Sequence, residues 1–439
     1  METKKTLAGF LFFVAIIADA APVAKYVCTI VNDHTNLTYR AGENAVFTVT
    51  VADTNGVKAT AGMVTATLDN FGMEKISTVK IDLAKDNPFS VTGRLVEAGF
   101  LRLNVAGKDV TPRVWSVAYD PTLIRAATDR PDDFMAYWKN EKERLAREVP
   151  LDAKITPIPY KSTADWDVSA ISFATFGGKR VYGFISVPKD KSKAPFPVRF
   201  NVPGAGPGAR DTSRIAGTIS VVVNVHPYDP LSGEIKELYA AQNKELGAKW
   251  NVPGYATSGV SGKREDYFFH DVILGIDRVL DWVAARPDVD KTRIRYSGSS
   301  QGGGFGLILT GLNGNISRLA VNVPAITDLL GRRAGRQSGW PQIVENQRTD
   351  EAKAAAEKIA PYFDAVHFAS YIKCPVRMSV GFSDTCCAPP AVYSAFNAIP
   401  AKDKKMFEGY GMGHTICPEF HRAFSKWLDE QDAACAADG

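Results

Sequence analysis

Residues 294–312 combine a short apolar segment, a serine flanked by glycines and a glycine-rich apolar segment, in the order IRYSGSSQGGGFGLILTGL. Within them, Gly298 to Gly302 form a Gly-x-Ser-x-Gly motif whose central residue is Ser300. A serine between a strand and a helix needs a tight turn with a strained backbone, and glycine at the two flanking positions leaves room for it. We therefore predict a strand that ends at the motif and a helix that begins at Gln301. A strand joined directly to a helix is typical of parallel sheets covered by helices.

The same alternation continues on both sides of the motif. Apolar residues at helical spacing predict helices at 265–285, from 301 onward and at 418–429. Strands alternating with helices indicate the α/β class, with a mostly parallel sheet and helices on both faces. Together with the serine turn, they predict an α/β-hydrolase fold at residues 151–434, preceded by a helical lead-in at 120–150. The predicted strands are residues 169–176, 180–187, 198–202, 219–225, 293–296, 319–323, 376–381 and 405–409.

The N-terminal part of the chain, residues 21–119, has a different pattern. Short segments alternate apolar and polar residues and are separated by Asn, Asp and Gly, as in AVFTVTV at 45–51, MVTATL at 63–68 and FLRLNV at 100–105. This pattern predicts a small all-β sandwich of immunoglobulin-like type. No pair of nucleophile and base can be assembled from its residues. Its role is open between a packing or spacer module and a carbohydrate-binding module.

The first twenty residues have the composition of an export signal. Lys4 and Lys5 precede an apolar run at 7–17 and the small-x-small sequence Ala18-Asp19-Ala20. Because the run is shorter than the ~20 residues of a spanning helix, we predict a signal peptide at 1–20 and a secreted or periplasmic protein without stable membrane insertion. The formal net charge of +4, from 52 basic and 48 acidic residues, is too small to indicate a nucleic-acid partner.

Ser300 needs a base to accept its proton and a carboxylate to orient that base, and the predicted fold requires the order serine, acid, histidine. Of the three histidines after Ser300, His414 lies in a glycine loop between a predicted strand and the last predicted helix, the position of the base in this fold. His367 precedes the next carboxylate at a strand end, and His421 lies inside the last helix. Asp384, three residues after a predicted strand, has the matching position for the acid. The sequence therefore predicts Ser300, His414 and Asp384 as a catalytic triad.

An acyl-transfer site also needs two hydrogen-bond donors for the developing oxyanion. The helix that begins at Gln301 directs its first backbone N–H groups toward the serine, so we assign one donor to the Gln301 N–H. The loop at residues 201–206, NVPGAG, follows an earlier strand, where the predicted fold has its second donor. We assign that donor to the Ala205 N–H, with the Gly206 N–H as the near alternative. This chemistry requires no metal and no organic cofactor.

Six cysteines would lie in an oxidising compartment if the chain is exported, and disulfides form there. The adjacent pair Cys386-Cys387 lacks the spacer of a zinc or redox motif, and no histidine cluster accompanies it, so the sequence predicts no metal site. The pair closely follows Asp384, and Cys417 closely follows His414. Because the acid and base loops must meet, a disulfide between Cys417 and one member of the pair is one hypothesis. Buried free thiols are the alternative.

Several short stretches beyond the serine motif are informative together: Arg130-Pro131-Asp132-Asp133-Phe134 with Trp138, Ser300-Gln301-Gly302-Gly303-Gly304, Asn322-Val323-Pro324, Tyr362-Phe363-Asp364 with Phe368-Ala369, and Val380-Gly381 leading to Asp384, Cys387 and Pro389-Pro390. With them, residues 129–428 resemble the acetyl xylan esterase and cephalosporin C deacetylase family. The resemblance implies the same triad and oxyanion donors, acetylated oligo- or polysaccharide substrates and a homo-oligomer. Family members usually carry tyrosine at the position of Ala205 and Arg-Gly-Gln at the position of Asn224-Val225-His226, so we expect a different substrate pocket.

These patterns together predict a secreted serine carbohydrate esterase. It would remove acetyl groups from acetylated xylan or xylo-oligosaccharides, with other acetylated small molecules as further candidate substrates. A prolyl-oligopeptidase-like serine peptidase uses the same triad, but such enzymes normally carry a propeller in place of a ~100-residue sandwich. A non-catalytic polysaccharide-binding protein would fit the export signal and the sandwich, but the ordered triad argues against it.

Overall fold

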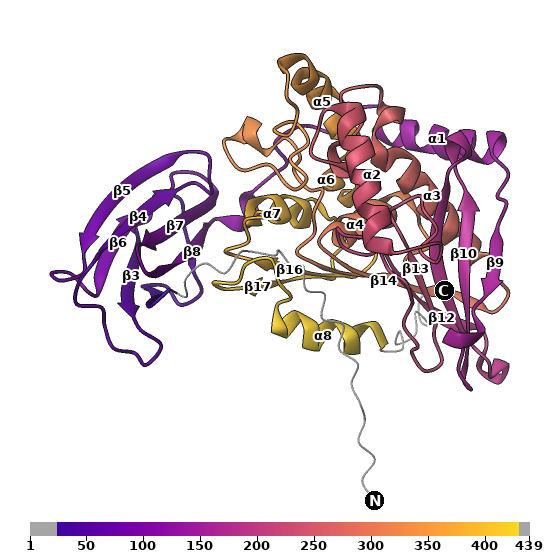
Figure 1. The fold of residues 1–439 in the computed structure, drawn as a ribbon, viewed down its shortest axis with the longest axis horizontal. Coiled ribbons are helices and arrows are strands. Elements are labelled where there is room, and N and C mark those ends of the chain that lie inside the picture. Colours follow the sequence, from indigo (N-terminus) through magenta and orange to yellow (C-terminus); the bar gives the residue numbers. More distant parts are fainter. Residues whose placement is uncertain (1–23, 430–439) are drawn as a thin grey trace, which may run out of the picture.

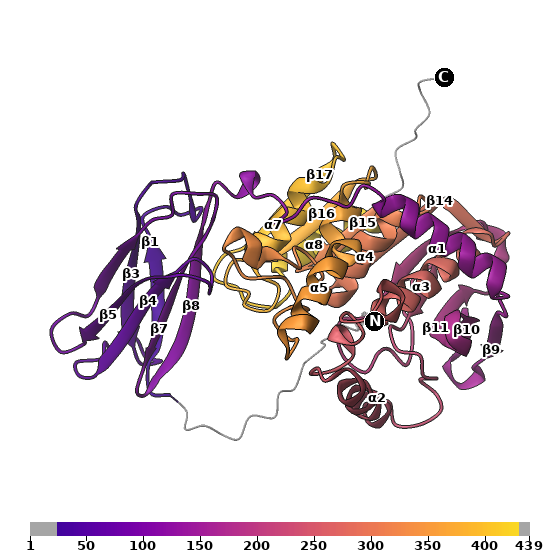
Figure 2. The ribbon, with the colours of Figure 1, turned by 90° about the horizontal axis from the view of Figure 1, so that it is seen from above.

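The computed structural model describes residues 24–429, which form two folded units (Figure 1). A β-rich unit, drawn in indigo, lies at one end of the molecule, and a larger unit of helices and strands forms the rest. Seen from above in Figure 2, the two units lie side by side. The predicted signal peptide at 1–20 and the predicted end of the hydrolase region at 430–434 lie outside the described residues.

Two sheets build the β-rich unit, with the strand orders β1-β3-β6 and β2-β8-β7-β4-β5. Strand β3 illustrates how the alternating pattern produces them, because Ala45, Phe47, Val49 and Val51 are completely buried and the residues between them are half-buried. Between β1 and β8 the described chain contains no helix, which confirms the prediction of an all-β segment. The strands are β1 Val27–Asn32, β2 Thr38–Tyr39, β3 Ala45–Ala52, β4 Met63–Asp69, β5 Lys75–Asp82, β6 Phe89–Gly93, β7 Gly99–Gly107 and β8 Val110–Tyr119.

One large sheet organises the second unit, in the order β17-β16-β15-β14-β12-β13-β11-β10-β9. Strand β12 pairs in parallel with β13 on one side and with β14 on the other, and β14, β15, β16 and β17 follow in parallel. Strands β9, β10 and β11 form an antiparallel edge, in which β11 pairs with β13. Strand β13, ISVVV, is buried along its whole length, which explains why four of its five residues are apolar. The predicted mostly parallel sheet is confirmed. The strands are β9 Lys154–Pro157, β10 Trp166–Ala174, β11 Arg180–Pro188, β12 Phe196–Asn201, β13 Ile219–Val223, β14 Val289–Ser299, β15 Arg318–Asn322, β16 Val376–Gly381 and β17 Lys404–Gly409.

Helices cover both faces of the large sheet. Helix α8 packs on β15 and β16 from one face, and α4 packs on β14 and β15 from the other (Figure 1). The sequence pattern predicts α1, α3, α4 and α8 but not α2, α5, α6 or α7. Among the residues that the structure describes, no helix is long and apolar enough to cross a membrane. The helices are α1 Phe134–Glu148, α2 Ile235–Trp250, α3 Phe268–Ala284, α4 Gln301–Leu312, α5 Asp350–Phe363, α6 Ala365–Ala369, α7 Pro389–Ala398 and α8 Pro418–Asp429.

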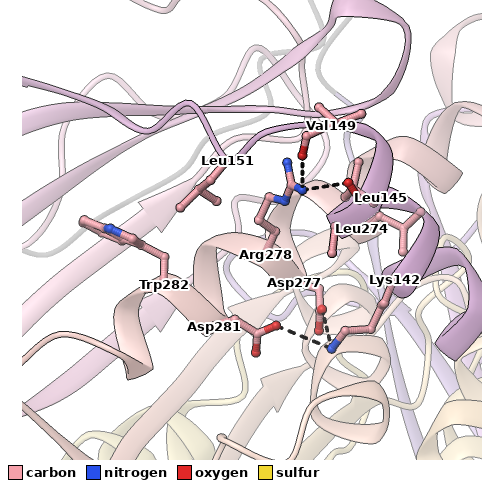
Figure 3. A pocket seen from close by; sticks show the side chains of 10 residues that line it. Lys142, Leu145, Val149, Leu151, Leu274, Asp277, Arg278, Asp281 and Trp282 are labelled. Carbon is pink, nitrogen blue, oxygen red and sulfur yellow. Dashed lines mark hydrogen bonds and ion pairs between the residues drawn. The ribbon is translucent and has the colours of Figure 1, made fainter.

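The lead-in helix α1 is held on α3 by charged groups around a shallow hollow (Figure 3). The ammonium group of Lys142 lies 2.6 Å from a carboxylate oxygen of Asp277. The guanidinium of Arg278 donates to the carbonyls of Leu145 and Val149 at 3.0 and 2.8 Å, where α1 ends. Because Lys142 is paired with Asp277 and Arg278 with backbone carbonyls, these contacts fix α1 on α3. None of the predicted triad residues lines the hollow, so it is not the predicted reaction site.

The two units are in direct contact at the loops that follow β16 and β17. Ser116 of β8 donates its hydroxyl hydrogen to the carbonyl of Phe382. Arg113 of the same strand donates to the carbonyl of Gly411 at 3.4 Å. The ring of Phe100 meets the ring of Phe382 edge-on, with the centroids 5.1 Å apart. Because these two loops also carry the predicted acid and the predicted base, the β-rich unit contacts the segments on which the site depends.

Candidate active site

Ser300 occupies the turn between β14 and α4 and has a backbone that L-residues rarely adopt, with φ 56° and ψ −123°. Such a conformation costs about 1–3 kcal/mol and persists only where the surroundings hold it. The Ser300 N–H donates to the carbonyl of Asn322 at 2.9 Å, and the Ser300 carbonyl accepts from the N–H groups of Gly304 and Ala325 at 3.0 and 2.9 Å. These three backbone bonds hold the turn, and the hydroxyl projects from it.

The two glycines of the motif are required by close backbone contacts. A Cβ on Gly302 would lie 2.0 Å from the carbonyl oxygen of Val202, and a Cβ on Gly298 would lie 2.5 Å from the carbonyl oxygen of Gly302. Both distances are far shorter than any tolerated contact. The structure thus supports the steric reason by which the sequence pattern predicts a tight turn at Ser300.

The structure brings the three predicted triad residues into one hydrogen-bonded row. The Nε2 atom of His414 lies 2.9 Å from the Ser300 hydroxyl, and its Nδ1 atom lies 2.8 Å from Asp384 Oδ2. Asp384 is completely buried, and its other oxygen accepts the backbone N–H groups of Cys386 and Cys387 at 2.8 and 2.9 Å. Since the carboxylate accepts the Nδ1 hydrogen, Nε2 presents its lone pair to the serine. This is the arrangement that abstracts a hydroxyl proton.

The electrostatics of His414 follow from the same contacts. Burial lowers the pKa of the His414 imidazole, but the hydrogen bond and the negative charge of Asp384 outweigh burial and raise the pKa above its usual 6.5. The side chain remains 32% exposed, so a substrate can reach its outer edge. The carboxylate of Asp384 thus makes His414 a stronger base for accepting the serine proton.

The loop with the predicted second oxyanion donor lies beside the serine. A Cβ on Gly204 would lie 4.0 Å from the Cβ of Ser300, and Ala205, the next residue, is exposed. His226 stabilises this loop, because its Nε2 atom donates to the carbonyl of Gly206 at 2.8 Å. Burial lowers the pKa of His226 to about 4, which keeps the ring neutral in that contact.

Gln301, the predicted first donor, is the first residue of α4, where backbone N–H groups have no partner within the helix. Its side chain is buried and its amide oxygen accepts the Tyr255 hydroxyl at 2.6 Å. Asn224 bonds both the N–H and the carbonyl of Ala209, at 2.7 and 2.9 Å. Sequence reasoning noted Asn224 only as a departure from the family motif and missed Tyr255. Nothing in their spacing shows that they support the loops around the serine.

Of the two hypotheses for the cysteines, the structure favours free thiols over a disulfide. The five cysteines within the described residues are all free thiols, so a disulfide between Cys417 and the pair Cys386-Cys387 is not formed; Cys435 lies outside those residues. The pair also does not stand alone. The two sulfur atoms and a ring nitrogen of His414 lie within 4.8 Å of one another. The sequence shows no histidine cluster near the pair, and in the structure a single histidine, on the loop after β17, lies beside it.

A parallel sheet with a serine turn after β14, and with an acid and a histidine on the loops after β16 and β17, defines the α/β-hydrolase class of protein. Comparison with known proteins gives the family. Residues 122–431 match the model of the acetyl xylan esterase (AXE1) family, and the chain belongs to that family. It is therefore an esterase of the carbohydrate-directed type.

Individual relatives agree with this assignment. The acetyl esterase Axe7A of Xylanibacter ruminicola is 27% identical over 446 residues, which cover 98% of this chain and 97% of that protein. Among solved structures, an acetyl xylan esterase from Paenibacillus sp. R4 has a TM-score of 0.57 at 20% identity, over 70% of this chain and 97% of its own. Acetyl xylan esterase 1 from Thermoanaerobacterium sp. JW/SL YS485 has a TM-score of 0.56 at 18% identity, over 70% of this chain and 96% of its own. The two structures share the fold of the hydrolase unit.

Proposed function

We propose that this chain is a serine carbohydrate esterase that removes acetyl groups from acetylated xylan and xylo-oligosaccharides. Ser300 is the nucleophile, His414 the general base and Asp384 the residue that orients the base. The observation that carries the proposal is the hydrogen-bonded row from Ser300 through His414 to the buried Asp384. Membership of the acetyl xylan esterase family supports the carbohydrate ester as substrate class.

The reaction proceeds in two steps. The Ser300 oxygen attacks the acetyl carbonyl while its proton moves to His414 Nε2, and the backbone N–H groups of Gln301 and Ala205 bind the oxyanion. When the tetrahedral intermediate collapses, the same proton passes from His414 to the departing sugar oxygen, which leaves acetyl-Ser300 and a free hydroxyl. Water then attacks the acetyl group and gives its proton to His414, and acetate leaves as Ser300 recovers that proton.

Substrate choice depends on the loop beside the serine. With Ala205 in place of the family's tyrosine, the pocket has less bulk at the second oxyanion position, and we propose that it accepts larger alcohol or acyl groups than a tyrosine would allow. A panel of acetylated xylo-oligosaccharides, other acetyl sugars and longer acyl esters tests this. A preference confined to acetyl xylan, with no turnover of longer esters, would contradict the wider pocket.

The proposal also includes export of the protein, an immunoglobulin-like type for the β-rich unit and self-association of the chain. A secreted or periplasmic location rests on the composition of residues 1–20, and a homo-oligomer rests on the family resemblance. The two-sheet arrangement favours an immunoglobulin-like sandwich at residues 21–119, ahead of the lead-in and the hydrolase domain. Gel filtration of the exported protein, with N-terminal sequencing, tests the cleavage site and the oligomeric state together.

The decisive variant is Ser300→Ala, assayed with p-nitrophenyl acetate and with acetylated xylan. Loss of the nucleophile is expected to lower kcat by a factor on the order of 10⁶ and to leave the fold intact. Ser299→Ala is the matched control, because it removes the neighbouring hydroxyl at the end of β14 and leaves the row in place. Near-normal turnover by Ser300→Ala would overturn the assignment. Faster cleavage of prolyl peptide anilides than of acetyl esters would instead favour a peptidase.

A further inference from the structure

A sulfur and nitrogen cluster, formed by Cys386, Cys387 and His414, lies within the proposed active site. One ligand atom from each residue lies within 4.8 Å of the others. The two thiols are held in place because the backbone N–H groups of both cysteines donate to the same oxygen of Asp384. Cys387 is buried, Cys386 is half-buried and His414 is open to solvent, so a small ion can enter from the substrate side.

The donor set of the cluster matches a soft divalent cation. Two thiolates and one neutral imidazole are a usual set of protein ligands for Zn²⁺, with bonds of about 2.3 Å to sulfur and 2.0–2.1 Å to nitrogen. Ligand atoms arranged tetrahedrally at these bond lengths lie about 3.5–3.8 Å apart. The present atoms lie at most 4.8 Å apart, about 1 Å more than that arrangement requires.

The group that contacts His414 on its other side is also typical of zinc sites. Histidines that bind metals usually donate their other ring N–H to a carboxylate, which fixes the tautomer and makes the free nitrogen a better ligand. His414 has this arrangement, since Asp384 accepts its Nδ1 hydrogen and leaves the Nε2 lone pair available. The Ser300 hydroxyl lies 2.9 Å from Nε2, so it or a water molecule can take the fourth position.

We propose that Cys386, Cys387 and His414 bind a thiophilic divalent cation such as Zn²⁺, and that the bound ion reversibly blocks the esterase. Binding releases the two thiol protons to solvent and forms two metal–sulfur bonds and one metal–nitrogen bond. The Nε2 lone pair that holds the ion is the one that must accept the Ser300 proton. Metal binding and proton abstraction therefore exclude each other. The inhibition rests on the proposed function, whereas the binding of the ion does not.

The test uses the full-length protein kept reduced with a non-chelating phosphine. Zn²⁺ affinity is measured by competition with a chromophoric chelator, Co²⁺ is added separately to record thiolate-to-cobalt charge-transfer absorption, and hydrolysis of p-nitrophenyl acetate is followed at each Zn²⁺ concentration. We expect one ion per chain, the charge-transfer band, and inhibition that EDTA reverses. Mg²⁺, a hard cation, is expected to cause none of these effects.

Cys386→Ser is the diagnostic variant, and its inhibition is expressed relative to its own metal-free activity. Loss of an outer-shell partner costs about 10- to 100-fold in metal affinity, and Cys386 is a direct ligand, so we expect the variant's Zn²⁺ affinity to fall by at least about 100-fold, with a parallel rise in the Zn²⁺ concentration for half inhibition. Cys28→Ser, which removes a half-buried free thiol of β1 in the other unit, is the matched control and is expected to behave like the unmodified protein.

Equal inhibition of Cys386→Ser and of the unmodified protein would overturn the metal site. If Cys386→Ser does not fold, the cobalt spectrum of the unmodified protein still decides, because a spectrum without the charge-transfer band also overturns it. The two proposals fail separately. An active esterase without thiolate-bound cobalt refutes the metal site alone, whereas an inactive protein that binds cobalt through thiolates refutes the proposed function alone.

Discussion

Ser116 is the residue through which the β-rich unit most directly contacts the loop that carries Asp384. Its hydroxyl donates to the carbonyl of Phe382, and both residues are completely buried. In the Ser116→Ala variant this carbonyl loses that donor at a site that water does not reach. Such a loss costs about 1–3 kcal/mol of the free energy of unfolding.

Part of this lost free energy is expected to raise the activation barrier of the reaction, because Phe382 lies two residues before Asp384. The Asp384 N–H donates to the carbonyl of Gly381 at 3.1 Å and closes the turn at residues 381–384. A displacement of Phe382 is therefore expected to displace Asp384. If the whole 1–3 kcal/mol appeared in the transition state, kcat/KM would fall by roughly 5- to 160-fold. Since other backbone bonds hold the turn, we expect a loss near the lower limit, mainly in kcat.

The assay combines equilibrium unfolding in urea with kcat and KM for p-nitrophenyl acetate. Ser90→Ala is the control, because Ser90 is an exposed serine of β6 in the same unit. It is expected to change neither quantity. A Ser116→Ala variant that is less stable but has an unchanged kcat would refute a positioning role for the β-rich unit and leave only a structural one. Deleting residues 21–117 is the coarser test, and we expect it to abolish activity.

Four further predictions concern the hydrogen-bonded row and the turn around it. Because His414 must be neutral to accept a proton and its pKa is raised, kcat/KM is expected to rise with pH through an apparent pKa above 6.5. A pH-independent kcat/KM would contradict this. Asp384→Asn is expected to lower kcat by a factor on the order of 10⁴, since the amide favours the wrong imidazole tautomer, and an unchanged kcat would refute the role of Asp384. His226→Ala frees the Gly206 carbonyl and is expected to lower kcat about tenfold, whereas His421→Ala on the exposed face of α8 should match the unmodified protein in the same assay. Gly302→Ala brings a Cβ to 2.0 Å from a backbone carbonyl oxygen, and we expect no soluble folded protein on expression; a folded, active variant would show that the turn relaxes.

Local sequence was sufficient where an element is specified by its own side chains. The alternation of apolar and polar residues in β3 and in β16 predicts these strands at nearly their observed bounds. Helix α2 was missed because no residue of Ile235–Trp250 is buried, and its sequence lacks a strong apolar face. Helix α7 begins with Pro389-Pro390, which were noted only as a family motif although proline is favoured in the first turn of a helix.

By itself, the sequence predicted the class of the fold and the three residues, Ser300, Asp384 and His414, that the structure brings into one hydrogen-bonded row. Motif, chain order and loop position are local properties that a single chain displays. Only the tertiary structure decided what surrounds them: the contact of Ser116 with the loop before Asp384, the support of Gly206 by His226, and the meeting of Cys386 and Cys387 with the His414 ring. Each of these joins segments far apart in the chain. The physical reason is that a side chain's neighbours in space are set by sheet order and by how the units pack, and neither property is encoded in the spacing of residues along the chain.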